Sequence, residues 1–123
     1  MKHNPADWFE IYVQDMPRAR AFYQDVFQVT LEKLKLDQPE MWAFPMNSGQ
    51  YGCSGALVHF VGMPSGGNST IVYFACEDCA VQAGRVAGAG GKIMRDKMSI
   101  GEYGSIALAF DTEGNMFGMH SMQ

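Results

Sequence analysis

The sequence predicts an α+β fold built from two copies of one unit, on the basis of three observations. A strand pattern followed by an aspartate and an amphipathic helix occurs near the N-terminus and again in the second half. The two aspartates, Asp15 and Asp78, lie 63 positions apart. A segment rich in Gly, Pro and Ser, residues 62–69, separates the two halves. We therefore expect one domain over residues 1–123, with a first module at about 6–61 and a second at about 70–123.

Composition and charge place the chain among ordinary globular proteins. Its 123 residues are 47% hydrophobic and 18% charged, which is enough for one core. The net charge is −4 and no cluster of Lys or Arg occurs, so we expect no nucleic-acid partner. No apolar run approaches the roughly 18 residues of a membrane span, and no signal-peptide pattern precedes the first strand. We expect a cytoplasmic protein whose three cysteines are free thiols.

The first strand pattern, residues 8–13, has two unlike faces. Side chains alternate across a strand, so every second residue shares a face. The apolar face should pack on a helix and comprises Phe9, Ile11 and Val13. The other face carries two aromatic rings and one carboxylate, from Trp8, Glu10 and Tyr12. Because this mixture suits a pocket wall better than a core, we expect it to face a cavity.

The remaining elements follow from caps, periodicity and turns. Asp15 and Asp78 are N-caps of helices predicted over residues 16–27 and 79–89. Gly90 and Gly91 end the second helix. The other expected strands cover residues 29–36, 41–46, 55–61, 71–76, 92–95, 105–110 and 116–121.

The ordered set of these motifs resembles the vicinal oxygen chelate superfamily, and most closely its glyoxalase-like bacterial branch. That superfamily includes glyoxalase I, bleomycin-resistance proteins, extradiol dioxygenases and methylmalonyl-CoA epimerase. The stretches that carry the resemblance cover nearly the whole chain: Trp8–Ile11, Asp15, Ala21–Tyr23, Ser54–Val58, Val72–Phe74, Ala89–Lys92, Ile100–Gly101, Asp111–Asn115 and Gly118–Ser121. The resemblance implies two tandem βαβββ modules that form a curved, incomplete barrel around a shared cavity.

The resemblance also implies where a metal would bind, because metal-dependent members carry one ligand on the first and last strand of each module. The corresponding positions here are Trp8, Gly55, Ile71 and Gly118. None of these side chains can ligate a divalent metal. We therefore expect no cofactor, and a metal-dependent lactoylglutathione lyase or dioxygenase is disfavoured.

Two residues are candidates for proton transfer. Glu10, beside aromatic rings, fits a general base or a hydrogen-bond anchor, and the alternative is a structural carboxylate paired with an Arg or backbone amides. His120 has the strand alternation of Gly118 and should also face the cavity. Its alternative role is that of a partly exposed strand histidine near the chain end.

Further residues are candidates for ligand contact or for simple packing. The expected ligand-binding set is Trp8, Tyr12, Phe44, Gly55, His59, Tyr73 and Gly118. The two glycines would leave space where a ligand side chain otherwise stands. Cys76 and Cys79 form a C-x-x-C, which we interpret as buried small residues and not as a redox motif. The loop predicted over residues 97–104 could close over a ligand or simply connect two strands.

Two functional hypotheses remain from the sequence. The first is metal-independent binding of a small apolar or aromatic ligand in the cavity between the modules. The second is a lyase or isomerase that acts on a small carbonyl substrate with Glu10 as base. Such modules pair within one chain or between chains, so a homodimer is left open.

Overall fold

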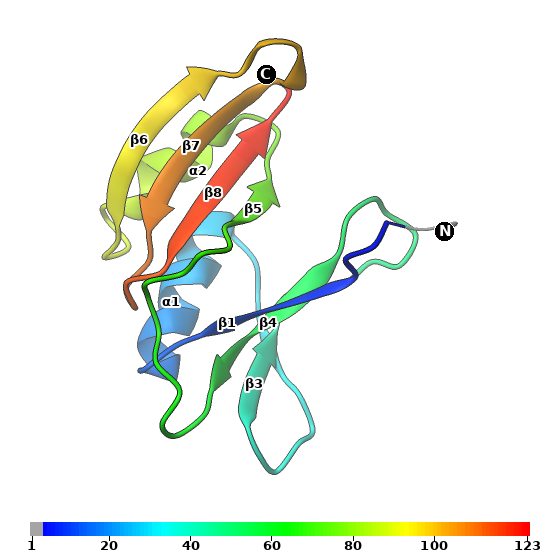
Figure 1. Cartoon of the computed structure of the whole chain (residues 1–123), viewed down its shortest axis with the longest axis vertical. Helices are drawn as coiled ribbons and strands as arrows, with labels where there is room; N and C mark the ends of the chain where they lie inside the picture. Colours follow the sequence, from blue (N-terminus) through cyan, green and yellow to red (C-terminus); the bar gives the residue numbers. More distant parts are fainter. Residues whose placement is uncertain (1–3) are drawn as a thin grey trace.

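Two four-stranded sheets, each carrying one helix, make up the computed structural model of the chain, which describes residues 4–123 (Figure 1). The strands are β1 (Trp8–Tyr12), β2 (Glu32–Lys33), β3 (Glu40–Ala43), β4 (Ser54–His59), β5 (Val72–Ala75), β6 (Lys92–Ser99), β7 (Ser105–Phe110) and β8 (Met116–Ser121). The helices are α1 (Met16–Phe27) and α2 (Cys79–Val86), and a short 3-10 turn spans Gly101–Tyr103. Strand order is β1-β4-β3-β2 in one sheet and β5-β8-β7-β6 in the other. The predicted α+β fold of two βαβββ modules is therefore confirmed, and the described strands form no closed barrel.

Both helices begin where their aspartate caps predict. The Asp15 carboxylate accepts a hydrogen bond from the backbone N–H of Arg18 at 3.0 Å, and Asp78 accepts one from Ala80 at 3.0 Å. Helix α1 ends at Phe27, and its cap residue Gln28 adopts the left-handed conformation with φ 55°. The side of α1 that faces the core carries Met16, Ala19, Phe22, Tyr23 and Val26.

Helix α2 ends at Val86, three residues earlier than predicted. The chain turns back at once, because the N–H of Gly91 bonds to the carbonyl of Val86 at 2.9 Å and Gly90 has φ 102°. A Cβ atom on Gly91 would lie 2.5 Å from the carbonyl oxygen of Phe110 and 2.6 Å from the Phe22 ring. Glycine is therefore required for this turn to pack against α1 and β7.

Strand β2 is much shorter than the predicted strand over 29–36. It contains only Glu32 and Lys33. The preceding residue, Leu31, is buried, and its N–H donates to the side chain of Gln24 on α1 at 3.0 Å. Residues 29–31 are thus held by the helix and not by the sheet.

Strand β6 is longer than the predicted strand over 92–95 and continues to Ser99. Its pairing with β7 shifts register between Ile93 and Arg95 and again between Arg95 and Met98. Such irregularities interrupt the alternation of apolar and polar residues on which the prediction depended. The expected loop over 97–104 is therefore strand up to Ser99 and turn beyond it.

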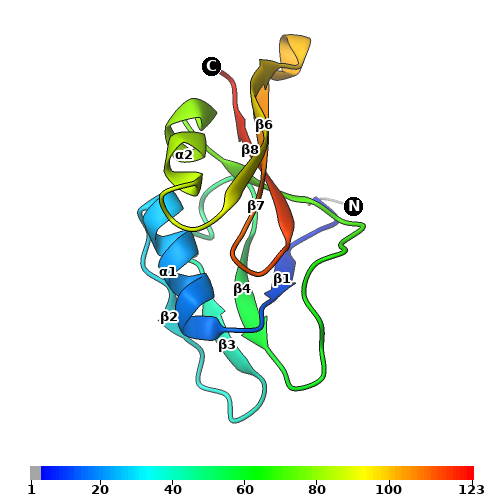
Figure 2. The ribbon, with the colours of Figure 1, turned by 90° about the vertical axis from the view of Figure 1, so that its left-hand side faces the viewer.

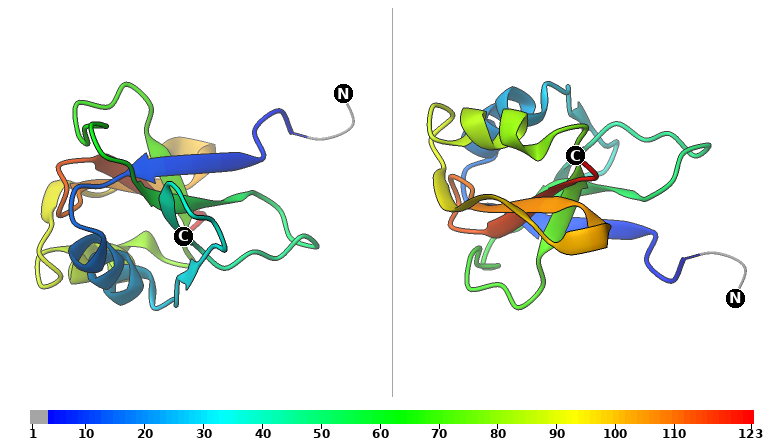
Figure 3. Two further views of the ribbon diagram at one scale, coloured as in Figure 1. Left: turned by 90° about the horizontal axis from the view of Figure 1, so that it is seen from below. Right: turned by 90° about the horizontal axis from the view of Figure 1, so that it is seen from above.

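One hydrophobic core contains residues from both modules. Helices α1 and α2 pack side by side on the same side of the sheets (Figures 2 and 3). Across the module boundary, the rings of Tyr23 and Phe117 are 5.6 Å apart and those of Phe9 and Phe74 are 5.8 Å apart. Aromatic pairs at these distances stabilise a core beyond the area they bury. The two modules therefore share one core.

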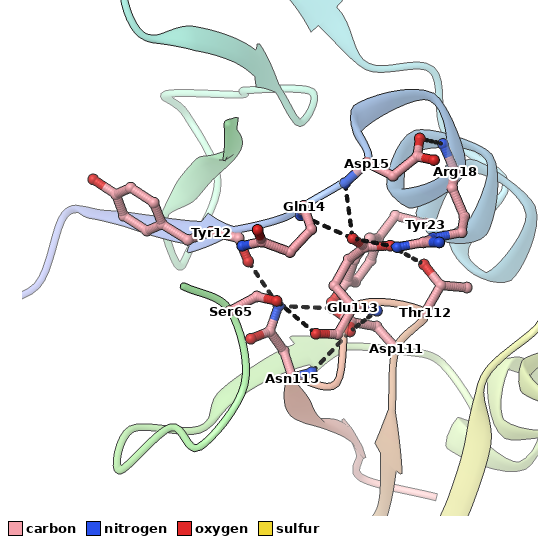
Figure 4. Close-up of polar contacts among 10 residues, drawn as sticks. All are labelled: Tyr12, Gln14, Asp15, Arg18, Tyr23, Ser65, Asp111, Thr112, Glu113 and Asn115. Carbon is pink, nitrogen blue, oxygen red and sulfur yellow. Dashed lines mark hydrogen bonds and ion pairs between the residues drawn. The ribbon is translucent and has the colours of Figure 1, made fainter. Parts of the chain in front are cut away.

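A buried carboxylate in the β7–β8 turn joins the modules (Figure 4). The Glu113 side chain is completely buried and forms a two-point ion pair with Arg18, from Nε to Oε2 at 2.7 Å and from a terminal nitrogen to Oε1 at 3.0 Å. The backbone N–H groups of Gln14 and Asp15 also donate to Oε1, at 2.8 and 3.0 Å. The Thr112 hydroxyl donates to Oε2 at 2.8 Å. Glu113 thus holds the β1–α1 junction against the second module.

The neighbouring residues of the same turn add further bonds between modules. The Tyr23 hydroxyl donates to Asp111 at 2.6 Å, and burial together with the Asp111 carboxylate raises the pKa of Tyr23 well above its ordinary value. The Asn115 side chain donates to the carbonyl of Tyr12 at 3.0 Å and accepts from the N–H of Gly66 at 2.6 Å. We call the interactions of Asp111, Glu113 and Asn115 the inter-module clamp (Figure 4).

Replacing Glu113 by glutamine should lower the free energy of unfolding by about 2–3 kcal/mol, because a neutral amide cannot satisfy Arg18 and the backbone donors together. Urea denaturation followed by circular dichroism measures this loss. Asp78→Asn is the control, since asparagine still caps α2 and the Lys97–Asp78 ion pair at 2.8 Å is exposed to solvent. The control should leave the free energy of unfolding nearly unchanged; equal losses in both variants would contradict the clamp.

Acid should weaken the clamp in a defined range of pH. Burial alone would raise the pKa of the Glu113 carboxyl, but the hydrogen bonds it accepts, first that from Arg18, outweigh burial and lower the pKa from 4.5 to about 2. A carboxyl with a lowered pKa in the folded state stabilises the fold above its unfolded pKa and loses that contribution as pH falls. The free energy of unfolding should therefore decrease from about pH 4.5 to about pH 2, and less steeply in Glu113→Gln. Urea titrations across this range measure the free energy of unfolding. A parallel decline for the wild type and Glu113→Gln would show that Glu113 is not the source of the pH dependence.

Candidate functional site

A groove of about 460 Å³ lies between the two modules, beside the edge strands β1 and β5. Strand β1 supplies one wall. The opposite wall comes from the connection between the modules and from the starts of β5 and β8. The principal residues that line the groove are Trp8, Glu10, Tyr12, Pro64, Asn68, Thr70, Val72 and Met116. A concave, mainly apolar site with a few polar groups is the usual form of a small-molecule site.

The three residues predicted to face a cavity lie together on this wall. Trp8 and Tyr12 are half-buried and Glu10 between them is exposed. The indole N–H of Trp8 donates to Oε2 of Glu10 at 3.3 Å, and the Tyr12 hydroxyl donates to Oε1 at 3.3 Å. Burial and the Glu10 carboxylate raise the pKa of Tyr12, so its phenol remains a donor at neutral pH. Both rings are thus held around one carboxylate.

Small apolar residues support this wall from the neighbouring strands. In the β1–β4 pairing Glu10 lies beside Ala56 and Tyr12 beside Val58. The β3 residues on the same face are Met41 and Ala43, which pair with Val58 and Ala56. These four buried residues form a cluster against which Trp8 and Tyr12 pack.

The connection over residues 62–69, predicted as a plain linker, also lines the groove. The Asn68 side chain donates to the carbonyls of Thr70 and Met116, at 2.7 and 3.0 Å, and accepts from the N–H of Met116 at 3.1 Å. The Ser65 hydroxyl donates to the carbonyl of Glu113 at 2.7 Å. Sequence reasoning missed these residues, because Gly, Pro and Ser content indicates a connection but not what it packs against.

Gly55 does not face the groove, so its predicted orientation is wrong. It pairs with Phe9 in the β1–β4 register, and a Cβ atom there would lie 2.3 Å from the Phe9 carbonyl oxygen and 2.5 Å from its ring. In the second module, Gly118 pairs with Tyr73, which corresponds to Glu10 after the shift of 63 positions. Glu10 itself pairs with Ala56, so Ala56 and not Gly55 corresponds to Gly118. The repeat offset is therefore 63 residues between the first strands but 62 between the last strands.

His59 and Phe44 also lie away from the groove. His59 pairs with Glu40 on the face of the first sheet that packs on the helices, near the start of α1. Phe44 is buried in the aromatic core, with its ring 5.7 Å from Phe9 and 5.6 Å from Tyr23. Both were predicted to contact a ligand, and neither lines the groove. For His59, the one-residue slip at β4 accounts for the difference.

Tyr73, Gly118 and His120 share the corresponding open face of the second sheet. The Tyr73 ring lies over Gly118, since a Cβ atom on this glycine would be 2.4 Å from the ring. His120 pairs with Ala75 near the far end of β8, and its Nε2 lies 2.6 Å from the carbonyl oxygen of Tyr103. Because a carbonyl only accepts, this nitrogen is the donor.

Glu10 and His120 are not brought together within one chain. The groove at Glu10 reaches β8 at Met116, and His120 is not among its lining residues. His120 lies four positions after Met116, a distance of about 13 Å along β8. The predicted acid–base pair therefore has no support in this geometry.

The residues at the family's metal positions do not fit a divalent ion. After the correction at β4, these positions are Trp8, Ala56, Ile71 and Gly118. Indole, alkyl and hydrogen side chains supply no oxygen, imidazole or thiolate ligand. Within residues 4–123, no group of three or more His, Cys, Asp or Glu side chains is arranged to hold a metal.

The cysteines of the C-x-x-C segment are unpaired, and Cys76 carries a thiol, not a thiolate, at neutral pH. Cys79 is buried, and burial together with the neighbouring Cys79 raises the pKa of Cys76 to about 11. A redox cysteine requires the opposite shift, toward the thiolate. The geometry therefore agrees with their interpretation as buried small residues.

Over residues 4–123, neither helix has the length and apolar character needed to cross a bilayer.

Several solved structures of low sequence identity share this fold. Glyoxalase I from Zea mays superposes with a TM-score of 0.71 at 21% identity, over 93% of this chain and 43% of that enzyme. A glyoxalase-related enzyme from Fulvimarina pelagi gives 0.72 at 17% identity, over 96% and 88% of the two chains. An antibiotic binding protein from Streptomyces gives 0.70 at 19% identity, over 98% of each chain. This chain thus spans less than half of the maize enzyme, and identities this low show the fold alone.

None of the curated protein sequences compared with this chain matches it significantly. The sequence profile of one family does match, over residues 6–119, which include both modules. The repeated βαβββ topology and the structural neighbours agree with that match. The chain belongs to the Glyoxalase/Bleomycin resistance protein/Dioxygenase superfamily.

Proposed function

We propose that this protein binds a small, flat, apolar or aromatic molecule in the groove between its modules and does so without a metal. The observation that carries the proposal is the wall of Trp8, Glu10 and Tyr12, in which two half-buried rings flank one carboxylate. Val72 and Met116 add apolar surface to the same groove. Aromatic rings present large, rigid faces on which a flat ligand stacks.

The charge of the groove narrows the ligand class. Glu10 is the one charged side chain among the described residues that line it. A carboxylate with no cation beside it repels anions and attracts cations. The groove should therefore prefer neutral or cationic aromatic molecules over anionic ones.

Binding without chemistry fits the site better than catalysis does. Both oxygens of Glu10 already accept hydrogen bonds, and His120 lies outside the groove. The side chains at the metal positions carry no atom that could ligate a metal, which removes the support for metal-assisted chemistry of the glyoxalase or dioxygenase type. The Streptomyces neighbour, described as an antibiotic binding protein, offers a precedent for this fold as a ligand binder.

We also propose that two copies form a homodimer in which the first sheet of each covers the second sheet of the other. The open face of the second sheet exposes two large side chains to water, Tyr73 by 46% and Met98 by 39%. That face carries the cations Lys92 and Arg95, paired with Phe110 and Leu108. The open face of the first sheet carries the carboxylate of Glu32, which does not line the groove. The opposite charges favour this pairing over a pairing of like faces.

A cytoplasmic location is consistent with this proposal. All three cysteines are unpaired, as expected in a reducing compartment.

Ligand charge should decide affinity in the groove. The wild-type protein should bind an aminoacridine cation at least about tenfold more tightly than an acridine carboxylate of similar shape, a difference of about 1.4 kcal/mol. Glu10→Gln should reduce that preference to less than about threefold, with thermal stability unchanged, because Glu10 is exposed. Isothermal titration calorimetry measures both affinities.

His59→Gln is the control and should bind as wild type does. Equal binding of both acridines by the wild type would refute the proposed role of Glu10.

The dimer should depend on the open face of the second sheet. Met98→Asp should raise the dimer dissociation constant by at least about tenfold, because it places a carboxylate in an apolar contact. Sedimentation velocity at micromolar concentration measures this shift. Val81→Asp, at a position on α2 that is 51% exposed, is the control and should sediment as wild type does. A wild-type protein that sediments as a monomer at these concentrations would overturn the dimer.

A further inference from the structure

A second cavity, of about 250 Å³, lies between the end of α1, the start of β4, strand β5 and helix α2. Its walls are mainly aromatic and come from both modules: Phe9, Phe27, Phe44 and Phe74. The Phe27 and Phe74 rings stack at 4.4 Å, and the Phe44 ring lies 5.4 Å from Phe74. Phe9 also lines the groove described above, so this one ring separates the two sites.

One polar group in these walls has no partner. Gln82 of α2 lines the cavity, and its Oε1 is buried without a hydrogen bond to any described residue. A second buried side-chain atom lacks a partner, Nε of Arg20, but that guanidinium lies over the Trp42 ring at 3.4 Å, which offers it a cation–π contact. Buried amides are nearly always hydrogen-bonded, so we expect Oε1 of Gln82 to bind a donor from outside the chain.

The mouth of the cavity carries a thiol. Cys53 is exposed and lines the cavity beside Ser54. Cys79 is buried, and Cys76 is half-buried with its pKa raised to about 11 by burial and the neighbouring Cys79. Thiolates are the reactive form, so a neutral alkylating reagent should modify Cys53 first. Because Cys53 lines this cavity, a ligand bound there should slow its alkylation.

We propose that this cavity is a second binding site, for a small aromatic molecule of one or two rings that makes a hydrogen bond to the Gln82 amide. The four phenylalanine rings provide stacking surfaces for such a molecule. The volume of about 250 Å³, smaller than the 460 Å³ of the groove, favours a ligand of one or two rings. The unpartnered oxygen of the Gln82 amide can accept a hydrogen bond from an N–H or O–H of the ligand.

Indole and benzothiophene provide a matched pair of probes, since they have nearly the same shape and only indole carries an N–H donor. Indole should slow the alkylation of Cys53 by iodoacetamide at concentrations at least about tenfold below those at which benzothiophene does so. Gln82→Met should remove this preference, because methionine keeps the length of the side chain and loses the amide. Mass spectrometry of the alkylated protein measures the rates.

Two further variants assign the effect to this cavity. Val29→Phe, which adds a ring to its lining, should abolish protection by indole, whereas Glu10→Gln in the groove should leave it unchanged. Circular dichroism confirms that each variant folds. The proposal is overturned if indole gives no protection up to its solubility, if both probes protect equally in the wild type, or if Glu10→Gln and not Val29→Phe removes protection.

Discussion

The buried carboxylate of Glu113 is the interaction on which the arrangement of this molecule depends. It lies in the turn between β7 and β8, yet four of the five hydrogen bonds it accepts come from the β1–α1 junction of the other module. A carboxylate without exposure to water is stable only when such donors satisfy it. The turn therefore fixes the end of β1 relative to the second sheet, and Asn115 extends this contact to the carbonyl of Tyr12.

The two candidate sites follow from this arrangement. Strands β1 and β5 are both edge strands, and the clamp holds them near each other without pairing them. The space between them becomes the groove walled by Trp8, Glu10 and Tyr12. On the other side of Phe9, aromatic side chains of both modules enclose the smaller cavity at Gln82. The same relative placement of the modules thus creates one site with a carboxylate and one with an amide.

The sequence predicts those features of the fold and site that depend on local pattern. Caps at Asp15 and Asp78 locate both helix starts, and alternation along β1 identifies the face of Trp8, Glu10 and Tyr12. Features that depend on register or tertiary contact were missed. A constant repeat offset makes Gly55 the equivalent of Gly118. In the structure β4 is displaced by one residue, so Gly55 and His59 lie on the face of the sheet that packs on the helices. The clamp was missed as well, because Asp111–Asn115 has the composition of an ordinary turn.

The two tryptophans allow the most direct test of the central claim, that ligands bind at the open face of β1. Trp8 lies in the groove, whereas Trp42 lies on the opposite face of the same sheet under Arg20. We predict that titration with an aminoacridine cation, followed by ¹H–¹⁵N NMR, shifts the indole N–H resonance of Trp8 and leaves that of Trp42 in place. A shift of the Trp42 resonance, or of neither at saturating aminoacridine, would contradict the account.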